Sequence, residues 1–82
     1  MAKLENTVEM MLSDDYKERF IAEYQQLVNR KNKLQKVIRE YNNNELNQEI
    51  LSCSDLLTWQ LKTMQMYEYI LKRRAEVEGI EL

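Results

Sequence analysis

The residues of this chain that could hold a charged ligand lie on one predicted helix. Its cation Lys31 interrupts a row of apolar and aromatic side chains at alternating steps of four and three residues. The row consists of Phe20, Tyr24, Leu27, Lys31, Leu34, Ile38 and Tyr41. This spacing keeps side chains on one side of an α-helix. The Lys31 ammonium therefore has three possible uses: it reaches water on its flexible stem, it fixes the register of the helix, or it binds an anion such as phosphate.

Basic residues are concentrated around Lys31. Residues 16–40 carry seven basic and three acidic side chains, a net charge of +4. Residues 1–15 and 41–61 each carry −3, residues 62–82 are neutral, and the whole chain carries −2. A positive potential confined to one helix suits a small anion, whereas duplex nucleic acid requires a more extended basic face. We therefore expect no binding of duplex nucleic acid.

Tyr16 could supply a flat face on which a nucleobase stacks. It lies about 22 Å from Lys31 along a continuous helix, so both cannot touch one small ligand from the same chain. Two antiparallel copies would bring Tyr16 of one chain beside Lys31 of the other. The alternative is that the five tyrosines of the chain are ordinary core and interface residues.

The composition offers no catalytic or metal site and no cofactor motif. There is no histidine, the single cysteine is Cys53, and the single glycine is Gly79. The usual zinc ligand sets, a neutral general base and a glycine-rich phosphate loop are therefore missing. We expect no enzyme activity, no catalytic residue, no metal and no cofactor, and no role for Cys53.

The pattern predicts an all-α fold in a single domain, residues 1–82. We expect a short helix at about 3–12, followed by a long antiparallel helical hairpin formed by helices at 15–41 and 55–78. Asp15 and Glu18 match a capping box, and asparagines at 42–44 end the long helix by tolerating the left-handed conformation. The connection at 42–53 should lie against the body of the protein and could contain a helical turn at 46–51. No apolar run is long enough to cross a membrane and no leader is visible, so we expect a cytoplasmic protein without a membrane partner.

The last helix carries two apolar stripes. The first stripe is Leu57, Leu61, Met64, Leu71 and Ala75. The second stripe is Leu56, Trp59, Met66, Ile70 and Val77. A single partner helix cannot cover both stripes. We therefore expect one stripe to pack within the hairpin and the other against another subunit of a homo-oligomer.

Two segments carry a resemblance to a known group of proteins. One runs from Asp14 through Tyr16, Arg19 and Phe20 to Arg30 and Leu34, and the other covers residues 60–76. They resemble small helical phage and prophage proteins related to a crAss-like phage protein. That layout is in turn similar to the anti-CBASS sponges of tailed phages. The resemblance implies a hexamer that sequesters cyclic di- or trinucleotide immune signals in the cytoplasm of the infected host.

The resemblance also implies site residues. Tyr16 matches a tyrosine that stacks on a base, and Lys31 matches a lysine from a neighbouring chain that meets phosphate. Arg19, Phe20 and Arg30 lie in the matching stretch and are further candidates. Arg73 and Arg74 are candidates for a second, larger-ring site, although near a helix end they could equally be solvated. The alternatives to a sponge are a protein–protein inhibitor or adaptor of anti-CRISPR type, and a structural helix bundle without a small ligand.

Overall fold

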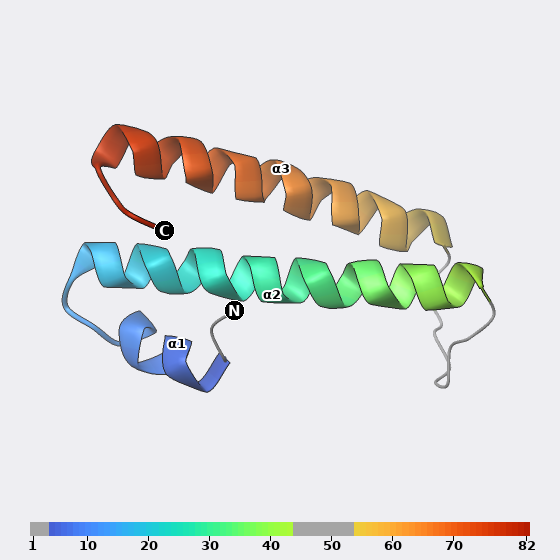
Figure 1. Cartoon of the computed structure of the whole chain (residues 1–82), viewed down its shortest axis with the longest axis horizontal. Coiled ribbons are helices and arrows are strands. Elements are labelled where there is room, and N and C mark those ends of the chain that lie inside the picture. The colour runs from blue at the N-terminus through green and yellow to red at the C-terminus, as the bar shows by residue number, and fades with distance from the viewer. Residues whose placement is uncertain (1–3, 44–53) are drawn as a thin grey trace.

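The computed structural model describes residues 4–43 and 54–82, which form α1 (Leu4–Met11), α2 (Tyr16–Asn42) and α3 (Ser54–Glu78). In Figure 1, α2 and α3 run antiparallel, and α1 lies on the other side of α2 from α3. The predicted all-α fold, a short N-terminal helix followed by two long helices, is confirmed. Within the described ranges, no helix is long and apolar enough to cross a bilayer.

Several expectations fall on residues that the structure does not describe. They are the start of the first helix at Lys3, the helical turn expected at 46–51, and the position of Cys53. Only the first two residues of the expected 42–53 connection lie inside the described ranges.

The start of α2 is fixed by a side-chain cap. Asp15 has extended backbone (φ −81°, ψ 118°), and its carboxylate accepts a hydrogen bond from the Lys17 amide at 2.9 Å. The reciprocal bond of the expected capping box is replaced, because the Asp15 amide donates to the Ser13 hydroxyl at 3.0 Å instead of to Glu18. Asp15 therefore caps the helix as predicted, while Ser13 takes over the part assigned to Glu18.

The end of α2 differs from the expected mechanism. Asn43 is the C-cap, and its φ of −95° is outside the left-handed region. Its amide continues the helical pattern by donating to the Arg39 carbonyl at 3.1 Å. At Asn43 the helix thus ends without the left-handed turn that the asparagine run suggested.

The end of α3 does use a left-handed residue. Gly79 has φ 69°, and the Ile80 amide donates to the Ala75 carbonyl at 2.9 Å. This six-to-one hydrogen bond, together with a buried apolar residue after the glycine, is the Schellman arrangement. It turns Ile80 back into the core.

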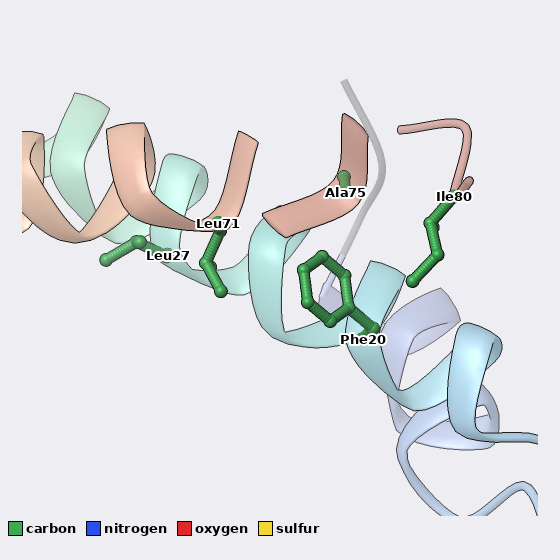
Figure 2. Close-up of a cluster of buried hydrophobic side chains, with 5 residues drawn as sticks. All are labelled: Phe20, Leu27, Leu71, Ala75 and Ile80. Carbon is green, nitrogen blue, oxygen red and sulfur yellow. The ribbon is translucent and has the colours of Figure 1, made fainter. Parts of the chain in front are cut away.

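The core lies where the start of α2 meets the end of α3. Figure 2 shows its five side chains: Phe20, Leu27, Leu71, Ala75 and Ile80. Leu71 is completely buried, and Met64 packs against the cluster from the same helix. Burial inside the hairpin is thereby confirmed for Leu71 and Ala75 of the first stripe, and Leu57, near the start of α3, is buried as well.

The second stripe is exposed in the single chain. Leu56, Trp59, Met66, Ile70 and Val77 are between 46% and 84% accessible. These five large apolar side chains find no cover among the residues that the structure describes, which leaves an apolar face along α3.

Candidate functional site

Tyr16 belongs to a compact cluster at the start of α2. We define the Tyr16 cluster as Tyr16, Phe20, Arg74 and Glu78. The Tyr16 hydroxyl accepts a hydrogen bond of 2.7 Å from Arg74 Nη2, which crosses from α3. The Arg74 guanidinium also lies over the Phe20 ring, 5.0 Å from its centroid. The Tyr16 and Phe20 ring centroids are 6.2 Å apart and tilted by 57°.

Helix geometry explains this assembly. Residues four apart lie on one face, so Tyr16 stands one turn before Phe20, and Arg74 one turn before Glu78. Phe20 is buried against Ala75 and Ile80 and anchors the cluster to the core. Tyr16 remains 46% exposed. Its ring is therefore held in place at one edge and open to a planar ligand.

The electrostatics of the cluster are balanced. Arg74 Nε donates to Glu78 at 3.2 Å, so the cation already has a carboxylate partner. The pKa of Tyr16 is raised above its ordinary value, first by its hydrogen bond to Glu78 and then by desolvation, despite the nearby Arg74 charge. Tyr16 is thus a neutral phenol near neutral pH, and its face is suited to stacking on a base.

Lys31 lies elsewhere, halfway along the hairpin. Its Nζ contacts both carboxylate oxygens of Glu68 on α3 at 3.0 Å. The side chains are only 15% and 14% exposed. Lys31 can therefore lie inside the seam because Glu68 of the same chain pairs with it. Neither of the structural uses expected for Lys31, reaching water on its stem or fixing the register of the helix, included this partner.

A groove runs between α2 and α3 beside this ion pair. Arg30 and Tyr67, the residues directly before Lys31 and Glu68, both line it, and its volume is about 300 Å³. The remaining lining residues are Glu23, Gln26, Leu27 and Met64. A cation, an exposed aromatic ring and polar side chains around an apolar floor are the kinds of group that small-molecule sites use.

The other predicted arginines are dispersed. Arg19 Nη1 donates to the Ser13 carbonyl at 2.8 Å and so supports the turn before α2. Arg73 pairs with Glu76 at 3.0 Å, and both side chains are more than 60% exposed. The structure therefore brings Tyr16, Phe20 and Arg74 together, and leaves Arg19, Arg73 and the Arg30–Lys31 pair at separate places.

Three polar residues that form contacts between helices were not predicted from the sequence, and two of them, Glu68 and Glu78, belong to these sites. Glu68 occupies the step between Met64 and Leu71 in the first stripe, so an acidic residue in an apolar row was the available signal. Glu78, which partners Arg74, gave no comparable signal. Thr7 is buried at 1% exposure and accepts a hydrogen bond of 2.9 Å from Gln26 Nε2, which helps to dock α1 on α2.

Metal binding has no support in the described ranges, where no group of three potential ligand side chains is found.

A protein-family model described as Sequestin matches residues 14–77, from the turn before α2 to the last turn of α3. Comparisons with curated proteins and with solved structures found no match.

Proposed function

The chain belongs to the Sequestin family, whose members are phage anti-CBASS sponges for cyclic nucleotides, and we propose that it holds its ligand reversibly and unchanged between two copies of itself. It is thus a phage counter-defence protein that sequesters a cyclic oligonucleotide signal. Release of the ligand without hydrolysis, and action in the cytoplasm of the infected host, are parts of the proposal. The observation that carries it is the family match, which includes Tyr16, Lys31 and Arg74.

In the proposed site, a base of the ligand stacks on Tyr16 and a phosphate meets Lys31 of the partner subunit. The exposed ring of Tyr16 favours stacking, and its contact with Arg74 keeps a cation beside the base. Arg30 and Tyr67, in the groove next to Lys31, offer a second cation and a second ring.

A shared site follows from helix length. Tyr16 and Lys31 are separated by about 22 Å on one helix, a span that a compact cyclic dinucleotide does not bridge while also stacking. Two antiparallel α2 helices bring the groups together from different chains. This requirement supports a homo-oligomer.

The second stripe of α3 supplies an interface for that oligomer. Its residues, with Thr63 and Arg73, follow a repeat of three and four residues, and antiparallel helices pair alternate positions of such a repeat. One register matches side chains by kind. In that register Trp59 meets the partner's Val77, Met66 meets the partner's Ile70, and Thr63 meets the partner's Arg73. Apolar residues then contact apolar residues, and polar residues contact polar ones.

The two contacts use different surfaces, α2 for the shared ligand and α3 for the second stripe. An assembly that satisfies both is larger than a dimer, which agrees with the hexamer expected from the resemblance. Symmetric assemblies commonly combine two such interfaces.

Calorimetry with purified, ligand-free protein tests the proposal. The panel contains cyclic di-AMP, cyclic GMP-AMP and cyclic tri-AMP, with the linear dinucleotide pApA as the control. We expect saturable binding of at least one cyclic compound, recovered with unchanged mass after the protein is denatured. Absence of heat with every cyclic compound, or recovery of a linearised product, would overturn it.

A further inference from the structure

Glu68 holds the cation on which the proposed site depends. Its two carboxylate oxygens lie 3.0 Å from Lys31 Nζ, and both side chains are about 85% shielded from water. This is the most shielded of the ion pairs found in the described part of the chain. Weak screening makes its effect on any incoming charge stronger than that of an exposed pair.

The geometry sets up a competition. A lysine ammonium has three N–H donors, and contacts to two Glu68 oxygens engage up to two of them. A phosphate that approaches Lys31 therefore finds a largely neutralised cation and a carboxylate at similar distance. The attraction of the phosphate to the Lys31 ammonium and its repulsion from the Glu68 carboxylate are comparable in size, since both fall off in the same way with distance.

We propose that Glu68 is an internal competitor for Lys31 that weakens phosphate binding and thereby determines the specificity of the site. The inference rests on the proposed function, because it assumes that Lys31 meets the phosphate of the ligand. With Lys31 neutralised, an isolated phosphate gains little. A ligand that also stacks on an aromatic ring supplies the additional binding energy and is retained. Glu68 thus discriminates against the simple phosphate compounds of the cell.

The test compares wild type with Glu68→Gln by calorimetry, using the cyclic compound of the panel that wild type binds. The amide oxygen of glutamine can still accept from Lys31, while the negative charge is gone. We expect binding to tighten by roughly three- to tenfold. Titrated alone, inorganic phosphate should also bind the variant more tightly than it binds wild type. The gain should persist at high salt, because the pair is shielded.

Glu40→Gln is the matched control. It removes the same charge, but from a more exposed pair, the one that Glu40 forms with Lys36 on α2. We expect no change in affinity beyond a small effect that salt abolishes. An equal gain in this control would mean that overall charge, and not competition for Lys31, sets the affinity.

A double-mutant cycle with Lys31→Gln completes the experiment. If Glu68 acts by competing for Lys31, the gain from Glu68→Gln shrinks when Lys31 is already replaced, because only the direct repulsion between carboxylate and phosphate is then removed. A gain of the same size in both backgrounds, or no gain in wild type, overturns the inference. Should Glu68→Gln fail to fold by circular dichroism, Glu68→Asp takes its place. A shorter acid holds Lys31 less closely, so Glu68→Asp should tighten ligand binding by less than Glu68→Gln. Affinity unchanged from wild type in this variant would also overturn the inference. Failure of wild type to bind any compound would instead refute the proposed function.

Discussion

The shared site can be tested by restoring it from two defective chains. Lys31→Gln removes the phosphate contact while leaving a donor for Glu68, and Tyr16→Ala removes the stacking face. Each variant alone should lose affinity. A hydrogen bond to a charged group contributes about 1.5 to 3 kcal/mol, or roughly ten- to a hundredfold in Kd. Stacking of a base contributes about 1 to 3 kcal/mol.

Mixed assemblies should recover a definite share of sites. A site is intact when its tyrosine comes from the Lys31→Gln chain and its lysine from the Tyr16→Ala chain. With equal amounts and random assembly, each condition holds for half of the chains, so about a quarter of the sites regain wild-type affinity in an oligomer of any size. The two chains are co-expressed with different tags, purified without selection for mixed species, and titrated by calorimetry.

The stoichiometry of high-affinity binding is the decisive measurement. Native mass spectrometry first establishes that the chains have mixed, and assemblies of each variant alone serve as controls. High-affinity stoichiometry near zero in verified mixtures would show that Tyr16 and Lys31 do not meet across a subunit boundary. Wild-type affinity in either single variant would remove that residue from the site.

Three further predictions concern assembly and stability. Ile70→Asp should dissociate the oligomer, because the charge would be buried in the second stripe, whereas Gln65→Asp on the same helix should leave the oligomer intact. Light scattering after size exclusion measures the oligomer mass, and an oligomer unchanged by Ile70→Asp would exclude the stripe as an interface. Leu71→Ala should lower the free energy of unfolding by about 2 to 5 kcal/mol in urea denaturation, because the side chain is fully buried in the core; a loss below about 0.5 kcal/mol, typical of surface sites, would contradict that placement. Gly79→Ala should cost about 1 to 2 kcal/mol in the same assay from its positive φ alone, since an added Cβ meets nothing within 4 Å; unchanged stability would show that the left-handed turn contributes little.

Local sequence patterns determined the secondary structure of this protein. The spacing of apolar residues predicted three helices, and the observed ends of α2 and α3 lie within about one residue of the prediction. Asp15 marked the start of α2 and Gly79 the end of α3, since each acts through its own neighbouring backbone. The sequence also distinguished two apolar stripes on α3, but helical period alone does not say which of them packs inside the chain.

Tertiary structure decided which charged side chains already have a partner within the chain. Sequence spacing placed Lys31 in the seam and Tyr16 on the same helix, and it suggested a pairing of the two between chains. Only the packing of α3 on α2 revealed that Glu68 neutralises Lys31 and that Arg74 bonds Tyr16, because these partners lie 37 and 58 residues apart in the chain. Whether a cation is free to bind a ligand depends on its distance to the nearest carboxylate. That distance is set by the register between α2 and α3, and the sequence of either helix alone does not determine this register.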